Sequence, residues 1–135
     1  MPRSDTVKPI PPDLKYTKTH EWVKTQSDGT VLVGITEHAQ GLLGDMVFVE
    51  LPEMNREFKQ ENEMAVLESV KAAADVYCPV SGKIIETNPK LQQNPELINQ
   101  DPYGEGWICK LKLSNESELN NLLSAQDYHA ICTAH

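Results

Sequence analysis

Short runs of apolar residues, separated by turn residues, occupy most of the chain. Residues 21–24 alternate polar and apolar side chains, and residues 27–29 (SDG) form a hairpin turn into the apolar run 31–35. Residues 46–51 form a strong strand pattern that ends at a proline. Further strands are predicted at residues 64–70, 72–77, 83–87 and 107–113. So many short strands at close spacing predict a mainly β fold, a compact β-sandwich or flattened barrel.

Helical patterns are few and short. Thr36 is a candidate N-cap for a helix over residues 37–43, and Gly44 lies just beyond the end of that helix. The Pro- and Asn-rich stretch 88–103 is predicted as a long connection with one helical turn at 95–98. Helices are therefore expected to be minor additions to a β framework.

The two ends of the chain differ in character. Four of the nine prolines fall within the first twelve residues, so residues 1–13 are predicted as a solvated, Pro-rich N-terminal arm. Near the other end, Asn115 and Glu118 resemble a capping box, and the leucines at 119, 122 and 123 mark one helical face. We therefore predict a C-terminal helix there, with a further turn or two over 127–131, and a single domain over residues 14–135.

Composition narrows the class of protein. A length of 135 residues is typical of one domain. Twelve Lys and Arg residues against twenty Asp and Glu residues leave a formal charge of −8. This acidity argues against nucleic acid or an anionic membrane as the main partner, because both attract clustered cations. With no apolar run of membrane-spanning length, no secretory signal and three widely spaced cysteines, we expect a reduced, cytoplasmic protein.

Catalytic signatures are missing from the chain. It contains no GxSxG, GxxxxGK, GxGxxG or HExxH sequence. His20 and His38 each stand beside a glutamate, but without HxxxH or CxxC spacing no metal site is expected. Cys78 has no cationic activator nearby in the sequence, which favours a structural thiol. We expect a protein that is not an enzyme; a small thiol- or metal-dependent enzyme built on His20, His38 and Cys78 is an alternative.

One lysine is a candidate functional residue. Lys71 lies between two apolar, strand-like runs, and its neighbours are small or apolar. If the runs pair as a hairpin, Lys71 sits at the turn with its amine directed outward, open to the pocket of a modifying enzyme. The alternative is an ordinary solvated lysine, since most lysines are exposed. The absence of Gly or Asn-Gly at the turn weakens the hairpin prediction.

Residues 68–72 (ESVKA) resemble the lipoyl-attachment signature of the glycine cleavage system H protein family. The resemblance extends in order along the chain, from about residue 14 to residue 131. It includes the segments 15–16 (KY), 19–23 (THEWV), 33–40 (VGITEHAQ), 43–52 (LGDMVFVELP), 79–84 (PVSGKI), 97–99 (LIN), 102–103 (PY) and 106–107 (GW). Such an ordered series is far more specific than the ESVKA motif alone.

This resemblance implies a fold and a function. The fold would be a lipoyl/biotinyl-type flattened β-barrel, or barrel-sandwich hybrid, with short helices, a C-terminal helix and Lys71 on an exposed hairpin. Lys71 would carry lipoate in an amide bond. The protein would be a lipoyl-carrying shuttle, a non-catalytic component that transfers the aminomethyl group of glycine between enzymes. Tethering of this kind replaces diffusion by an intramolecular search at high effective concentration.

The resemblance also implies partners and site residues. The partners would be glycine decarboxylase (P protein), aminomethyltransferase (T protein), dihydrolipoamide dehydrogenase (L protein), which takes the electrons, and a lipoate ligase or octanoyltransferase. Thr19, Glu21 and Asp75 occupy positions that the family uses to receive the loaded arm, with His38 close by. The residues implied in recognition by the modifying enzyme flank the lysine: Glu68, Ser69, Val70 and Ala72.

Some features depart from the family or leave alternatives open. Thr19 stands where the family often has serine, and residues 54–62 (MNREFKQEN) lack the usual glycines, which puts the shape of that loop in doubt. From the residues alone, Glu21 and Asp75 are expected to be solvated charges.

Other carrier classes fit less well. Lipoyl domains of 2-oxoacid dehydrogenases usually show Asp-Lys-Ala and biotin carriers Met-Lys-Met, whereas this chain has Val70-Lys71-Ala72. An H-like carrier that relays lipoate to other enzymes is an alternative function. A bacterial cytoplasmic location is expected, or the mitochondrial matrix for a processed eukaryotic chain.

Overall fold

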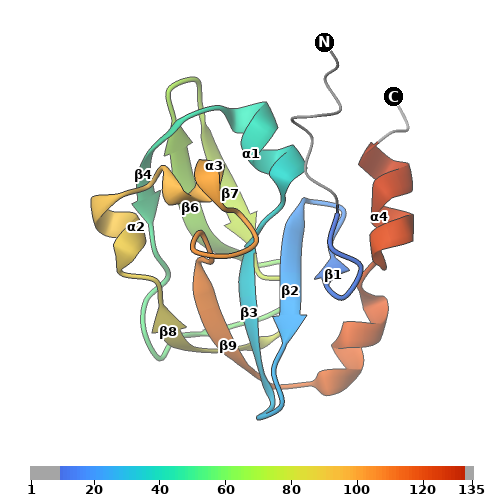
Figure 1. Ribbon diagram of the computed structural model, residues 1–135. Helices are drawn as coiled ribbons and strands as arrows, with labels where there is room; N and C mark the ends of the chain where they lie inside the picture. The colour runs from blue at the N-terminus through green and yellow to red at the C-terminus, as the bar shows by residue number, and fades with distance from the viewer. Residues whose placement is uncertain (1–9, 133–135) are drawn as a thin grey trace.

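The computed structural model describes residues 10–132, so most of the expected arm at 1–13 lies outside the described residues. The chain forms two antiparallel sheets (Figure 1). The larger sheet has the strand order β1-β2-β3-β9-β8-β5, and the smaller has the order β4-β6-β7. Within residues 10–132, no helix combines the length and the apolar character needed to cross a membrane.

The strands are short, as the spacing of apolar runs predicts. The larger sheet consists of β1 (Lys15–Tyr16), β2 (Glu21–Thr25), β3 (Thr30–Ile35), β9 (Cys109–Leu113), β8 (Gly82–Thr87) and β5 (Glu57–Phe58). The smaller sheet consists of β4 (Met46–Glu50), β6 (Glu63–Ser69) and β7 (Ala73–Tyr77). The helical segments are α1 (Glu37–Leu43), α2 (Lys90–Gln93), α3 (Leu97–Gln100), the 3-10 helix η2 (Glu116–Asn121) and α4 (Ala125–Cys132).

The main core lies between the two sheets. Strand side chains alternate between the two faces of a sheet, so one apolar set from each strand points inward. Fully or almost fully buried members of this set are Val33, Leu67, Val76, Ile84 and Leu111. The two sheets face each other as a flattened, incompletely closed barrel, which confirms the predicted fold class.

A second apolar cluster holds the C-terminal helix beside β1 (Figure 1). The rings of Tyr16 and Tyr128 stack with their centroids 4.8 Å apart. Trp22 is 1% exposed, and its indole nitrogen donates to the carbonyl of Pro102 at 2.9 Å. The indole lies so close to Gly34 that a Cβ there would be 2.7 Å from the ring.

Several local predictions are confirmed and others are wrong. The helix after Thr36 forms as predicted, and the Thr36 hydroxyl accepts a hydrogen bond from the amide of Ala39. The capping box is wrong, because the Glu118 carboxylate accepts bonds from the amide and hydroxyl of Ser81 instead of returning to Asn115. The segment that follows Asn115 is consequently a 3-10 helix, and the C-terminal α-helix is α4.

The two long connections contain more structure than their sequences suggest. The stretch 88–103 holds two short helices, α2 and α3, where one helical turn was predicted. The loop 54–62 holds β5, which the sequence pattern did not indicate, and Phe58 of β5 pairs with Gly82 of β8. Both cases are decided by pairing and packing against distant segments.

Candidate functional site

A two-residue turn presents Lys71 at the end of the β6–β7 hairpin. Glu68 is paired with Ala73 in this hairpin, and the amide of Ser69 donates to the carbonyl of Ala72 at 2.8 Å. The Ser69 hydroxyl oxygen accepts the amides of both Lys71 and Ala72 at 3.1 Å. This side chain therefore supplies the local hydrogen bonding of a turn that contains neither Gly nor Asn-Gly.

The turn is exposed, and its backbone is anchored. The amide of Val70 donates to the carbonyl of Asp45 at 3.0 Å, although the Val70 side chain is 66% exposed. The aliphatic stem of Lys71 lies over Gly44, where a Cβ would be 3.2 Å from Lys71 Cε. Gly44 has a φ of 82°, a conformation that L side chains rarely adopt. Within residues 10–132, the Lys71 amine forms no ion pair.

The residues expected to flank the lysine lie around this turn. Glu68 and Ala72 are exposed, as Val70 is, and Ser69 is half-buried because its hydroxyl closes the turn. Glu68 is the carboxylate closest in sequence to Lys71, on the strand that leads into the turn. All four side chains are thus placed where an enzyme approaching Lys71 would meet them.

One face of β7 leads away from the turn. Val76 points into the core, whereas Ala73, Asp75 and Tyr77 alternate with it and share the opposite face. Ala73 and Asp75 are exposed, and Tyr77 is half-buried. At about 3.3 Å per residue, this face extends roughly 13 Å from Ala73 to Tyr77. Asp75 therefore lies between the lysine turn and the far end of the strand.

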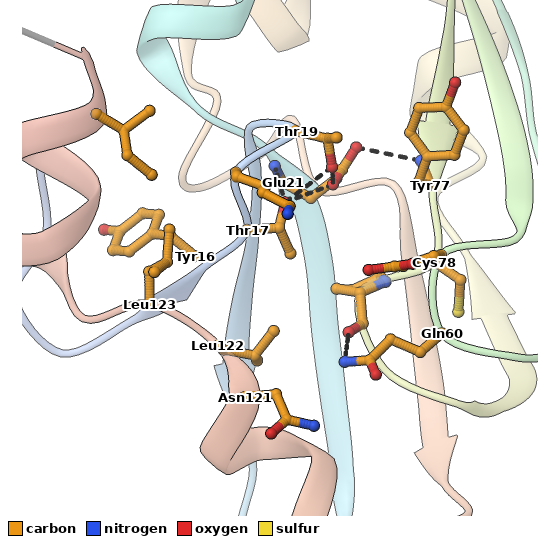
Figure 2. Close-up of a pocket in the computed structure, with 14 residues that line it drawn as sticks. Tyr16, Thr17, Thr19, Glu21, Gln60, Tyr77, Cys78, Asn121, Leu122 and Leu123 are labelled. Atoms are coloured by element: carbon orange, nitrogen blue, oxygen red, sulfur yellow. Dashed lines mark hydrogen bonds between the residues drawn. The ribbon is translucent and has the colours of Figure 1, made fainter. Parts of the chain in front are cut away.

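A buried carboxylate lies at that far end. Glu21 is 1% exposed, and its Oε1 accepts hydrogen bonds from the hydroxyls of Thr17 and Thr19 at 2.6 and 2.5 Å (Figure 2). Its Oε2 accepts the backbone amide of Tyr77 at 3.1 Å. The expectation of a solvated charge is wrong for Glu21, whereas Asp75 is exposed as expected.

The electrostatic state of Glu21 follows from these contacts. No cation among the described residues forms an ion pair with this carboxylate. Burial raises the pKa of Glu21 above its usual value, and hydrogen bonds from Thr17, Thr19 and the Tyr77 amide oppose that rise. The site is therefore an oriented, desolvated carboxylate without a positive partner, which favours a cationic ligand.

A cavity of about 770 Å³ opens beside this carboxylate. Its lining comes from the segments 16–19, 60–61, 77–79 and 121–123, together with Glu21 and Ile131 (Figure 2). Thr19 and Glu21 are among the lining residues, whereas Asp75 and His38 are not. Tyr77, Gln60 and the leucines at 122 and 123 are lining residues that the sequence did not indicate as part of a site. They are neighbours only in the fold, and no local motif connects them.

A thiol- or metal-dependent enzyme was the alternative hypothesis, and it required His20, His38 and Cys78 to lie together. The structure does not bring these three side chains into one site. Cys78 is 1% exposed, its thiol donates to the carbonyl of Val80, and burial raises its pKa to about 12. A thiol in this state is a poor nucleophile at neutral pH. The rings of His20 and His38 lie with centroids 4.9 Å apart, and the thiol beside them is that of Cys132.

Comparison with known proteins shows similarity over nearly the whole chain. A family model described as "Glycine cleavage H-protein" matches residues 14–135. The glycine cleavage system H protein of Symbiobacterium thermophilum is 60% identical over 121 residues, which cover 90% of this chain and 94% of that protein. The corresponding protein of Salmonella arizonae is 57% identical over 122 residues, with coverages of 90% and 95%.

A solved structure shows the same similarity in three dimensions. The crystal structure of a glycine cleavage system H protein from Mycobacterium marinum matches with a TM-score of 0.83 at 37% identity. The match covers 90% of this chain and 97% of that one. Sequence and fold thus point to the same family.

Proposed function

Because this chain belongs to the glycine cleavage H-protein family, we propose that Lys71 is the residue that carries its lipoyl group. The protein is a lipoyl-carrying shuttle of the glycine cleavage system and a non-catalytic component of it. One observation supports the proposal most: the exposed Lys71 and the buried carboxylate of Glu21, which forms no ion pair among the described residues, lie towards opposite ends of the strand β7.

The surroundings of Lys71 suit a modified lysine. The turn leaves its amine open to solvent, and Gly44 leaves room along the aliphatic stem. Amide formation removes the charge of the lysine, so the arm can enter other active sites without burying an ammonium. When attached, the lipoyl group would supply a disulfide that is reduced as one of its sulfurs takes the aminomethyl group of glycine, and whose later reoxidation passes two electrons on. The modifying enzyme would recognise the surface formed by the neighbours of this lysine, Glu68, Ser69, Val70 and Ala72.

We assign the receiving site for the loaded arm to Thr19, Glu21 and Asp75. Glu21 would bind the protonated amine at the end of the arm, and Thr19 orients the carboxylate through its 2.5 Å hydrogen bond. The exposed Asp75 would guide a cation along β7. Neither Asp75 nor His38 lines this cavity; we keep Asp75 because it lies on β7 between the lysine turn and Glu21, and we leave out His38, which lies on α1.

The protein acts within a multienzyme system. We propose that its partners are the P, T and L proteins and a lipoate ligase or octanoyltransferase, all of which must reach the exposed hairpin. The formal charge of −8 would give the protein an acidic surface, on which enzymes with basic residues around their active-site entrances can dock. By similarity to bacterial relatives, we place it in the bacterial cytoplasm.

Mass measurement tests the attachment site. The full chain would be expressed with lipoate and a lipoate ligase, then analysed intact and as peptides. We expect one lipoyl addition, on the peptide that contains Lys71. The addition should disappear in Lys71→Ala and persist in the control Lys83→Ala, which removes another exposed lysine. An unmodified Lys71 under these conditions would refute the proposal.

A further inference from the structure

The segment that joins α1 to β4 is held at two points by one side chain of α3. Asn99 Nδ2 donates to the carbonyl of Gly44 at 2.9 Å, and Asn99 Oδ1 accepts the backbone amide of Met46, also at 2.9 Å. The same Nδ2 donates to Gln40 Oε1 on α1 at 2.8 Å. These partners fix the orientation of the carboxamide, because its NH₂ group meets two carbonyl oxygens and its oxygen meets an amide. Asn99 therefore holds the residues on both sides of Asp45.

The lysine turn lies against this segment. The amide of Val70 donates to the carbonyl of Asp45 at 3.0 Å. A Cβ at Gly44 would be 3.2 Å from Lys71 Cε and 3.9 Å from a methyl carbon of Val70. The residue that accepts the bond from the turn thus stands between the two residues that Asn99 holds.

The side chain that holds the segment has a fixed base. α3 packs beside α1, and its Ile98 is fully buried in the main core (Figure 1). β4 is an outer strand of the smaller sheet, and Met46 faces Ser69 where the pairing of β4 with β6 begins. A chain of contacts therefore runs from the core through Asn99 and the α1–β4 segment to the lysine turn.

We propose that Asn99 is a positioning residue for the lysine turn, and that it determines how tightly a lipoate ligase binds this turn. The inference rests on the proposed attachment of lipoate to Lys71. In that step, the uncharged Nζ attacks the carbonyl carbon of lipoate, which the ligase holds as a mixed anhydride with a nucleotide phosphate. The C–N bond forms, the bond to the phosphate oxygen breaks, and the nitrogen gives up a proton. The ligase therefore needs the turn in a defined place.

Loss of the Asn99 contacts should affect binding more than the reaction itself. Without them, the α1–β4 segment would hold the turn in its anchored position for only part of the time. If that fraction falls to about one fifth, the apparent dissociation constant for the ligase rises about fivefold. Once the turn is bound, it is in place for attack. The expected signature is a higher KM for the chain with an unchanged kcat, since KM reports binding when amide formation is slower than dissociation.

The test measures lipoylation of the full chain by a lipoate ligase with ATP and lipoate, followed by intact mass over a range of chain concentrations. Asn99→Ala removes all three bonds. Asn99→Asp keeps the acceptor for Met46 and nearly the same shape, but it places a carboxylate oxygen against the Gly44 carbonyl. Asn99 is half-buried, so both variants should fold. We expect each to raise KM by about fivefold and to keep kcat within about twofold.

A second asparagine provides the matched control. Asn88 Nδ2 donates to the carbonyls of Glu105 and Trp107 at 2.7 and 2.8 Å, and its Oδ1 accepts the amide of Lys90 at 3.2 Å. These partners belong neither to the α1–β4 segment nor to the lysine turn. Asn88→Ala should lower the free energy of unfolding as Asn99→Ala does. It should leave KM unchanged, because a partly destabilised chain is still almost entirely folded.

Hydrogen exchange gives a second readout that needs no ligase. The Val70 amide, which donates to Asp45, should exchange about fivefold faster in Asn99→Ala, because its acceptor is no longer held in place. In Asn88→Ala, this amide should exchange as it does in the unchanged chain.

Three results overturn the role of Asn99: an unchanged KM in both folded Asn99 variants, an equal rise of KM in Asn88→Ala, or unchanged exchange of the Val70 amide in Asn99→Ala. Failure of the proposed function looks different. In that case Lys71 of the unchanged chain takes up no lipoate at all, and the inference is lost together with the proposed function.

Discussion

The backbone amide of Tyr77 donates to the carboxylate of Glu21 across 3.1 Å. Tyr77 ends β7 in the smaller sheet, and Glu21 begins β2 in the larger sheet, so this bond joins the two sheets. It also places the carboxylate at the far end of β7, the strand that starts beside Lys71. The Glu21 side chain, which joins the two sheets, is thus also the group that we propose binds the end of the lipoyl arm of Lys71.

The charge of Glu21 should protect the loaded arm. In Glu21→Gln, the amide oxygen can accept from Tyr77 and the NH₂ group can donate to the Thr17 and Thr19 hydroxyls, so the fold should be retained. Loss of a charge-assisted bond should speed the release of ammonia from the aminomethyl-charged carrier by about tenfold.

Ammonia release would be followed in the absence of the aminomethyltransferase. The matched control is Glu61→Gln, which makes the same chemical change at an exposed residue on the same cavity and should leave the rate unchanged. Equal rates for Glu21→Gln and the unchanged chain would remove Glu21 from the receiving site.

Stability should depend on the titration of Glu21. Burial raises its pKa, so the folded state binds the proton more tightly than the unfolded chain. The free energy of unfolding should therefore fall as pH rises from the unfolded pKa to the folded pKa. The loss of stability caused by ionised, buried Glu21 is complete above the pKa of the folded state, and there is no such loss below the pKa of the unfolded state.

Glu21→Gln cannot titrate at this position and provides the comparison. The free energy of unfolding of the variant minus that of the unchanged chain should increase with pH across this window and then become constant. Urea unfolding between about pH 4 and pH 7 measures this difference. A flat difference, or one that decreases with pH, would contradict the assigned direction of the pKa shift.

The hydroxyl of Ser69 should stabilise the lysine turn. Ser69→Ala leaves the amides of Lys71 and Ala72 without their 3.1 Å acceptor, at a cost of about 1 kcal/mol in local stability. Hydrogen exchange at these two amides should therefore accelerate by about fivefold. Ser69→Thr keeps the hydroxyl and should keep the protection, whereas unchanged exchange in Ser69→Ala would show that the turn does not depend on this side chain.

Two glycines should respond in opposite ways to alanine. Gly34→Ala places a Cβ 2.7 Å from the Trp22 ring, which should cost about 1–3 kcal/mol in the free energy of unfolding. Gly41→Ala, within α1, meets nothing within 4 Å and should stabilise the helix by up to about 1 kcal/mol. Urea unfolding of both variants checks the signs; a neutral Gly34→Ala would mean that Trp22 can shift without loss.

Local patterns were sufficient for most of the β framework, whereas the lysine turn, which lacks Gly and Asn-Gly, was expected mainly from the family resemblance. Apolar runs located most of the strands, and Thr36 with Gly44 bounded α1, because these signals depend on residues close in the sequence. The capping-box signal at Asn115 failed for the opposite reason. The Glu118 carboxylate accepts hydrogen bonds from the amide and hydroxyl of Ser81, a residue far away in the sequence, and therefore does not close the local capping box with Asn115.

By itself, the sequence determined the mainly β fold, the position of Lys71 between paired strands and, through ordered motifs, the family. Only the tertiary structure decided which polar residues are buried together. Glu21 shares its face of β2 with Val23, a member of the main core, and the β1–β2 turn and the end of β7 supply the hydrogen bonds that the buried carboxylate needs. The opposite face, that of Trp22, is covered by the second apolar cluster. Cys132 meets His20 and His38 because Tyr128 anchors α4. Such neighbours depend on long-range packing, which no local pattern encodes.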